Sequence, residues 1–196
     1  MLRKIDRVLT SRGILYLVTR FCGSALRRRA FDQNYISGRW DHFDKEPSTE
    51  IVKVIEKYAR KGRILDLGCG TGILASMLSP DSFEYYLGVD ASQEAIARAQ
   101  KRKGEKIRVE IGDILSYKPK GKFDLIVFAE SLYYVPYFRR RFLQCCARWL
   151  MPGGLFVVTV VEPRRFRSMI KMIRKNFQIV EDRFFQNSQR LLLVFG

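Results

Sequence analysis

The sequence predicts an α/β fold: a doubly wound, three-layer sandwich whose seven-stranded sheet is mostly parallel and has an antiparallel final strand. This prediction depends on two patterns. From residue 51 onward, short apolar runs alternate with segments of helical periodicity. Near the end, apolar runs at 177–186 and 190–196 are joined by the short turn NS, which is typical of an antiparallel hairpin.

The individual elements follow from the same alternation. Ahead of the hairpin, strands are predicted at 63–67, 85–90, 106–112, 123–129 and 152–161. Helices are predicted at 51–58, 71–78, 92–103, 136–150 and 166–175. Ser92 is a plausible N-cap, Gly104 is a stop signal, and the unbroken run FDLIVFA suits a strand that is buried on both faces.

The first 50 residues form a separate segment in this reading. Apolar residues recur at helical spacing from Ile14 to Ala25, with arginines beside them, which predicts one basic amphipathic helix. A short helix over 2–11, ending near Gly13, is expected before it. We therefore expect residues 1–50 to form a helical lid or substrate segment over a domain at 51–196. A helix lying on a membrane surface is the alternative.

Composition limits the class of protein. The chain has 196 residues, 47% hydrophobic and 29% charged, as expected for one soluble globular domain. Its four cysteines form no C-x-x-C pair, so neither a disulfide framework nor a metal site is expected, and a cytoplasmic location is the default. The run ILYLV is far shorter than the roughly 20 residues that cross a membrane.

The net charge of +16 lies at the two ends of the chain. Residues 1–30 carry eight Arg or Lys and one acid, and residues 139–196 carry twelve and three, whereas the middle is neutral. Such a field favours anionic partners: a nucleic acid such as RNA, an anionic membrane surface at which the protein is peripheral, or a phosphorylated substrate. A basic surface that only maintains solubility is the alternative. Arg27, Arg28 and Arg29, with Arg139, Arg140 and Arg141, are the candidate contact residues.

The segment ILDLGCGTG, residues 64–72, is the turn from the first predicted strand into the next helix. Ligands bind Rossmann-like sheets at this place, where glycines let them approach the backbone. The spacing is G-x-G-x-G and not the dinucleotide G-x-G-x-x-G. Asp66 precedes the first glycine, and Asp90 and Asp113 follow the next two strands. A cationic tail, a ribose and an adenine amine suit these three acids in turn, which together describe S-adenosylmethionine. A helix cap or a surface charge is the alternative for each acid.

Five segments follow one another within residues 51–161: ILDLGCGTG, GVDAS, GDI, FDLIVFAESLYYV and MPGGLFVVTV. In order and spacing they resemble the motifs of class I S-adenosylmethionine-dependent methyltransferases. The stretch YISGRWDHF, with the later ESLYY, has a weaker resemblance to small bacterial methyltransferases associated with polysaccharide or lipid-linked glycan synthesis.

The resemblance implies roles for further residues. Those expected to line the methionine part of the cofactor are Gly68, Cys69, Gly70 and Gly72. Ala91 and Ile114 would bracket the adenine ring, and Glu130 would touch cofactor or substrate. Arg39 lies in the segment that folds over the cofactor in similar enzymes, where it can meet the methionine carboxylate.

A sulfonium methyl group is already activated, so such an enzyme mainly aligns the acceptor and excludes water. The candidate general bases are Glu130, His42 and Asp41, and His42 is the only histidine. A structural role for His42 is the alternative. The expected substrate residues are Tyr35, Trp40, Tyr133 and Tyr134, although Trp40 also suits an anchor for the lid.

The expected function is methylation of an oxygen or nitrogen on a small-molecule, sugar or lipid-linked glycan acceptor. An RNA methyltransferase that uses the basic ends is the alternative. Against it, FAESLYY lacks the Asn/Asp-Pro-Pro-Tyr/Phe tetrapeptide typical of enzymes that methylate base amines. A non-catalytic scaffold is a third reading, which the intact glycine turn and strand-end acids disfavour. The sequence leaves the oligomeric state open.

Overall fold

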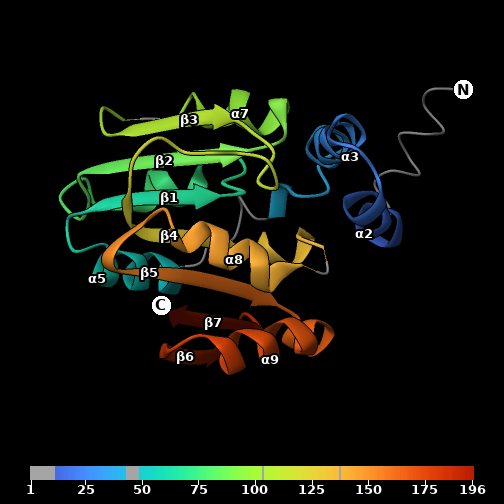
Figure 1. Ribbon diagram of the computed structural model, residues 1–196. Coiled ribbons are helices and arrows are strands. Elements are labelled where there is room, and N and C mark those ends of the chain that lie inside the picture. Colours follow the sequence, from blue (N-terminus) through green and yellow to red (C-terminus); the bar gives the residue numbers. More distant parts are fainter. Residues whose placement is uncertain (1–11, 43–48, 103, 137) are drawn as a thin grey trace, which may run out of the picture.

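The computed structural model describes residues 12–42, 49–102, 104–136 and 138–196. It contains one seven-stranded sheet in the order β3-β2-β1-β4-β5-β7-β6 (Figure 1). The strands are β1 Arg63–Leu67, β2 Tyr85–Asp90, β3 Ile107–Ile111, β4 Phe123–Ala129, β5 Leu150–Val161, β6 Ile179–Phe185 and β7 Arg190–Phe195. The pairs β1–β2, β1–β4, β2–β3 and β4–β5 are parallel, whereas β7 runs antiparallel to both of its neighbours, β5 and β6. The predicted fold class is therefore confirmed.

The helices cover both faces of the sheet. They are α2 Arg12–Phe21, α3 Ser24–Ile36, α5 Thr49–Ala59, α6 Ile73–Met77, α7 Gln93–Ala99, α8 Arg139–Ala147 and α9 Arg167–Asn176, with short 3-10 helices η1 Leu132–Tyr134 and η2 Pro163–Phe166. Alternate β4 residues face opposite layers: Leu125 and Val127 pack toward α5 and α6, whereas Ile126 and Phe128 pack toward α8 and α9. This alternation explains why the β4 sequence is an unbroken apolar run.

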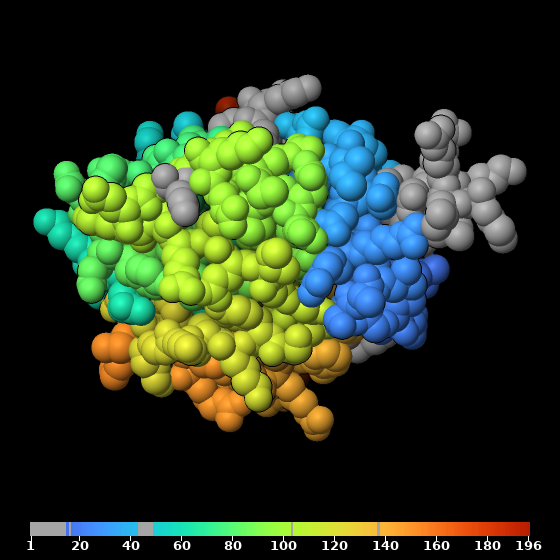
Figure 2. Space-filling model, turned by 90° about the horizontal axis from the view of Figure 1, so that it is seen from above, coloured from blue at the N-terminus to red at the C-terminus, as the bar shows by residue number. Residues whose placement is uncertain are grey.

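The parallel register brings the carboxyl ends of the strands to one edge. Asp66 of β1 lies opposite Gly88 of β2 and Val127 of β4, and Asp90 of β2 lies opposite Ile111 of β3. Helices α2 and α3 lie beyond this edge, at the right of Figure 1. Figure 2 shows the blue N-terminal atoms packed against the green atoms of α7.

The N-terminal prediction needs correction. The expected single helix over Ile14–Ala25 is two helices, because the chain breaks at Gly23, whose extended backbone caps α3. Gly13 does not stop a helix but lies inside α2. The helix expected at 2–11 lies outside the described residues.

Several boundaries also differ. Helix α7 ends at Ala99 and α6 begins at Ile73, both inside the predicted ranges. Strand β5 begins at Leu150, inside the predicted 136–150 helix, because Leu150 pairs with Phe123 of β4. The hairpin loop spans four residues, 186–189, and not two. The predicted N-cap is confirmed, since the Ser92 hydroxyl accepts a hydrogen bond from Ala95 N at 3.1 Å.

Candidate functional site

The glycine turn after β1 requires glycine for two separate reasons. Gly68, Gly70 and Gly72 have φ angles of 89°, 56° and 74°, in the left-handed region that favours glycine. A Cβ atom at Gly68 would also lie less than 3.0 Å from the Cβ of Ser131, closer than real Cβ atoms come. The turn can therefore present bare backbone to a ligand.

Asp66 is buried at the end of β1, and its two oxygens differ. The Tyr86 hydroxyl donates a short hydrogen bond to Oδ2, whereas Oδ1 has no partner among the described residues. Burial raises the pKa of Asp66 to about 7, partly opposed by the Tyr86 hydrogen bond. A buried oxygen without a donor is costly. Oδ1 thus suits a cationic or hydrogen-bonding group of a ligand.

Asp90 holds the glycine turn and the next helix together. Its Oδ2 accepts from Gly70 N at 2.9 Å, and its Oδ1 accepts from Ser92 N at 2.8 Å. Burial raises the pKa of Asp90 to about 6, although both backbone hydrogen bonds favour the charged form. Each carboxylate oxygen has two lone pairs, so Asp90 can still accept from a pair of ligand hydroxyls.

Asp113, after β3, is joined to the N-terminal segment. Arg27 of α3 donates to its Oδ2 from Nη2 at 2.6 Å and from Nε at 3.0 Å. The backbone of Leu115 donates to Oδ1 at 3.0 Å. Arg27 therefore does not lie on an exposed basic surface with Arg28, as its place in the basic N-terminal segment predicts, because its side chain points inward to Asp113.

We expect Arg27→Met to loosen α3, because it removes the charge-assisted hydrogen bonds to Asp113. The loss for a largely buried ion pair of this geometry is about 1–2 kcal/mol, which corresponds to roughly 5- to 30-fold faster hydrogen exchange of α3 amides. Arg28→Met, at the exposed neighbouring position, is the control. Equal exchange rates in the two variants would show that this ion pair does not hold α3.

These groups share a cavity at the carboxyl ends of the strands. The predicted site residues that line it are Tyr35, Trp40, Asp66, Gly68, Cys69, Gly70, Asp90, Ala91, Asp113, Ile114, Glu130 and Tyr134. Gly72 is not among its walls and instead precedes α6 as its N-cap. The roles proposed for these residues toward a cofactor stay predictions.

Sequence reasoning missed several residues of the cavity wall. Among them are Thr19, Arg27, Phe31, Met77, Ser131 and Arg190. No motif marks Arg190, which the hairpin brings from the far end of the chain. The position of Ser131 directly after the FDLIVFAE run was the available signal. Its hydroxyl donates to Leu67 O at 2.5 Å and so ties β1 to the segment after β4.

Glu130 is committed to contacts within the protein. Its Oε1 accepts from Arg190 Nε at 2.8 Å, and its Oε2 accepts from Val161 N at 2.7 Å. Burial raises the pKa of Glu130, and Arg190 opposes this shift. Glu130 therefore connects β4 to β5 and β7 while it lines the cavity.

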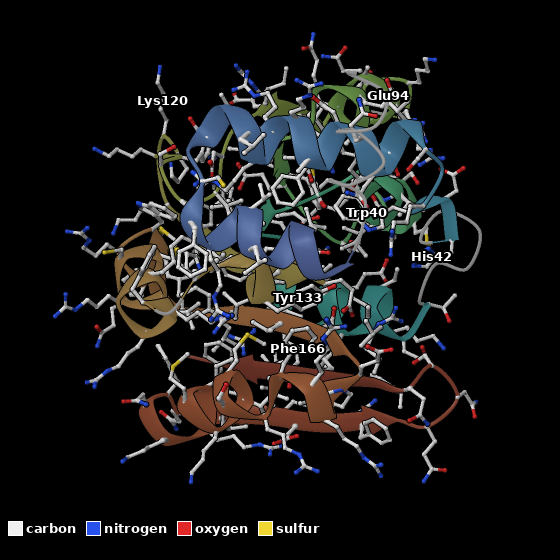
Figure 3. The ribbon with its side chains drawn as sticks, turned by 90° about the vertical axis from the view of Figure 1, so that its right-hand side faces the viewer. Trp40, His42, Glu94, Lys120, Tyr133 and Phe166 are labelled. Atoms are coloured by element: carbon white, nitrogen blue, oxygen red, sulfur yellow. The ribbon has the colours of Figure 1, made fainter. Side chains whose placement is uncertain are left out.

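A second cavity, of about 550 Å³, lies beside the first. Trp40 and Tyr134 line both. The other predicted residues in it are Arg39, His42 and Tyr133, which the structure does not bring to the first cavity. Figure 3 shows Trp40, His42 and Tyr133 on the side of the molecule that carries α2 and α3. Asp41 lines neither cavity and instead accepts from Arg98 at 3.1 Å.

Two further observations concern the chemistry available at the site. Cys69 is buried, and burial raises the pKa of its thiol well above the usual value, so it stays a neutral thiol. Within the described ranges, no group of three or more His, Cys, Asp or Glu side chains could hold a metal ion.

The chain was compared with known proteins. A family model described as "Methyltransferase domain" matches residues 39–190. The solved N-methyltransferase NodS from Bradyrhizobium japonicum WM9, in complex with S-adenosyl-L-homocysteine, is 25% identical, with a TM-score of 0.64 over 80% of this chain and 90% of that one. A TehB-like S-adenosylmethionine-dependent methyltransferase from Corynebacterium glutamicum is 24% identical, with a TM-score of 0.66 over 85% and 98%.

The curated relatives match only in part. A ribosomal protein L11 methyltransferase from Thermotoga neapolitana is 37% identical over 86 residues, 41% of this chain and 32% of that protein. A ubiquinone biosynthesis O-methyltransferase from Xylella fastidiosa is 33% identical over 140 residues, 64% and 56%. The chain thus spans about one third to just over half of the length of the curated relatives it matches.

Proposed function

This chain belongs to the methyltransferase-domain family and is an S-adenosylmethionine-dependent methyltransferase, and we propose that it methylates an oxygen or nitrogen on a small-molecule, sugar or lipid-linked glycan acceptor. One observation carries this proposal. The cavity that contains Asp66, Asp90 and the glycine turn shares Trp40 and Tyr134 with a second cavity large enough for such an acceptor.

The residues of the first cavity fit S-adenosylmethionine. Asp66 Oδ1 is a buried acceptor to which no group of the described residues donates, as binding of the ammonium of the methionine part requires. The glycine turn leaves backbone where a Cβ would obstruct, and Asp90 faces the same cavity for a ribose. Asp113 and Ile114 line it for an adenine. When bound, S-adenosylmethionine supplies a methyl group activated by its sulfonium.

We assign the lid role to residues 1–50 through α2, α3 and Trp40. Arg27 ties α3 to Asp113, and Asp32 accepts from the Ser92 hydroxyl at 2.6 Å. Trp40 packs against Tyr35 at a centroid distance of 4.8 Å and against Tyr134 at 6.1 Å. These rings enclose the border between the two cavities, which excludes water from the acceptor.

His42 is the favoured proton acceptor among the three candidates, because Glu130 is ion-paired with Arg190 at 2.8 Å and Asp41 lines neither cavity. Nδ1 of His42 lies 3.0 Å from the Arg39 carbonyl oxygen, which can only accept. Nδ1 therefore carries the hydrogen in the neutral ring, and Nε2 carries the lone pair that can take the acceptor proton.

Calorimetry tests the assignment of the cofactor cavity. S-adenosylhomocysteine is expected to bind the purified protein with an affinity in the micromolar to millimolar range of metabolite sites. A transfer screen with labelled S-adenosylmethionine against sugar nucleotides, lipid extract and total RNA then identifies the acceptor class. No binding of either cofactor form would contradict the proposed function, and labelling of RNA alone would replace the acceptor with RNA.

The outer face of α2 supports a peripheral membrane location. Leu15 and Val18 are buried, yet Leu17 and Phe21 on the opposite side are 54% and 70% exposed. A helix with apolar residues on both sides can bury one side in the protein core, and its other side is stabilised by contact with a further apolar phase such as lipid. Exposed arginines, among them Arg28, Arg140 and Arg141, complement an anionic lipid surface. No helix in the described ranges combines the length and apolarity needed to cross a bilayer.

Phe21→Asp is expected to reduce flotation of the protein with vesicles of phosphatidylcholine and phosphatidylglycerol by at least about fivefold, because it places a charge where the ring would enter the lipid. Val180→Asp, at an exposed apolar residue of β6, is the matched control. Equal flotation of both variants, or retention on RNA but not on vesicles, would overturn the membrane assignment.

A further inference from the structure

The second cavity has a distinctive set of walls. It is lined by Leu15, Arg39, Trp40, His42, Tyr133, Tyr134, Val161, Glu162, Arg165 and Phe166. These residues come from α2, the segment after α3, η1, the end of β5 and η2. Figure 3 shows Tyr133 and Phe166 between α2 and the C-terminal part of the sheet.

Its aromatic rings form flat, fixed surfaces. Tyr133 stacks on Phe166 with centroids 4.5 Å apart and an angle of 10° between the rings. Tyr134 lies 4.7 Å from Tyr133 and 6.1 Å from Trp40, measured between centroids. Because ring faces and edges prefer other rings in offset or edge-to-face contact, such walls suit an aromatic ligand.

The charged groups of this cavity are mainly cationic. Among the described residues that line it, Arg39 and Arg165 are cationic and Glu162 is anionic. The Arg165–Glu162 pair is long, with Nη1 and Oε2 3.8 Å apart, and both side chains are exposed. A planar guanidinium can bind a carboxylate or phosphate through two parallel hydrogen bonds. The cavity therefore combines an aromatic wall with a site for an anion.

We propose that the second cavity takes an aromatic acceptor that carries an anionic group, with its ring beside Trp40 and Tyr134 and its anion at Arg165. This proposal rests on the proposed function and narrows its acceptor to one chemical class. For a ring hydroxyl, the oxygen forms a bond to the methyl carbon as the carbon–sulfur bond breaks. The bonding pair stays on sulfur, and the hydroxyl proton passes to Nε2 of His42.

A charge series tests the proposal on the full chain saturated with S-adenosylhomocysteine. The three probes are 3,4-dihydroxybenzoate, 3,4-dihydroxybenzamide and 3,4-dihydroxybenzylamine, which share a ring and differ in charge. We expect the anion to bind at least about tenfold more tightly than the cation, with the amide between them. Benzoate and phenyl phosphate, compared in a second arm, distinguish a carboxylate from a phosphate.

Arg165→Gln is expected to bring the affinity for 3,4-dihydroxybenzoate close to that for the amide, without changing the affinity for S-adenosylhomocysteine. Arg164→Gln is the control, because Arg164 is exposed and does not line the cavity. The series is then repeated with labelled S-adenosylmethionine to measure methyl transfer to the ring hydroxyls.

The outcomes separate the two proposals. Binding of S-adenosylhomocysteine together with equal or absent binding of all three probes would overturn the anionic aromatic acceptor and leave the methyltransferase assignment intact. An unchanged preference for the anion in Arg165→Gln would also overturn it. Failure of S-adenosylhomocysteine to bind would instead contradict the proposed function itself.

Discussion

Asp66→Asn is expected to weaken binding of S-adenosylhomocysteine by about 1.5–3 kcal/mol, the range for hydrogen bonds to charged groups. The variant keeps the shape of the side chain but loses the negative charge beside the unpartnered Oδ1. Calorimetry at pH 8 measures this loss. Asp81→Asn, at an exposed acid outside the cavity, is the control and should bind as the unmodified protein does.

The same substitution is expected to increase the stability of the protein above neutral pH. Burial raises the pKa of Asp66 to about 7 in the folded protein, whereas the carboxyl of the unfolded chain titrates near pH 4. The folded state binds the extra proton, so this carboxyl lowers the free energy of unfolding progressively as the pH rises from about 4 to about 7. The full penalty, on the order of 4 kcal/mol, applies above pH 7.

Urea unfolding with S-adenosylhomocysteine absent measures this effect. Asp66→Asn should flatten the dependence of the free energy of unfolding on pH between about 4 and 7, while Asp81→Asn should leave it unchanged. A stability loss at pH 8 in Asp66→Asn would show that this carboxylate supports the fold and is not held there for a ligand.

Gly68→Ala is expected to have the largest effect on stability among the glycine positions compared. Its φ of 89° strains any residue with a Cβ, and that atom would also meet Ser131 at less than 3.0 Å. Strain in this region costs roughly 1–3 kcal/mol, and the overlap adds a further cost of about 1–3 kcal/mol. Chemical unfolding should therefore show a loss of about 2–6 kcal/mol.

Two matched variants separate the causes. Gly153 has a φ of 76° but open space around its Cβ position, so Gly153→Ala should show the strain alone. Ser131→Gly combined with Gly68→Ala removes the overlapping Cβ and should recover part of the loss. Equal destabilisation by Gly68→Ala and Gly153→Ala would contradict the close approach to Ser131.

The sequence alone predicted those features for which a short pattern of residues is compatible with a single local structure. The G-x-G-x-G turn after an apolar run predicted the sheet edge, and Asp66, Asp90 and Asp113 do line one cavity. The alternation of strands and helices predicted the sheet and its antiparallel final strand. These features depend on the spacing of residues that are close together in the sequence, and that spacing can be read from one sequence.

Contacts between distant segments were not predictable in the same way. In the sequence Arg27 is indistinguishable from its exposed neighbour Arg28, and only the packing of α3 on the sheet edge turns it toward Asp113. Arg190 reaches Glu130 because β7 returns beside β5, across 60 positions of sequence. The break at Gly23 was hidden because apolar spacing continues across it.

The central claim is that Asp66 and the glycine turn hold the amino-acid part of S-adenosylmethionine at the strand ends. Titration of the unmodified protein with S-adenosylhomocysteine at several pH values between 5 and 8 tests this claim most directly. We predict an affinity that rises through the pKa of Asp66, about 7, where half of the carboxylate is charged, and that levels off only toward pH 8. Tight binding that is independent of pH, or no binding at any pH in this range, would contradict it.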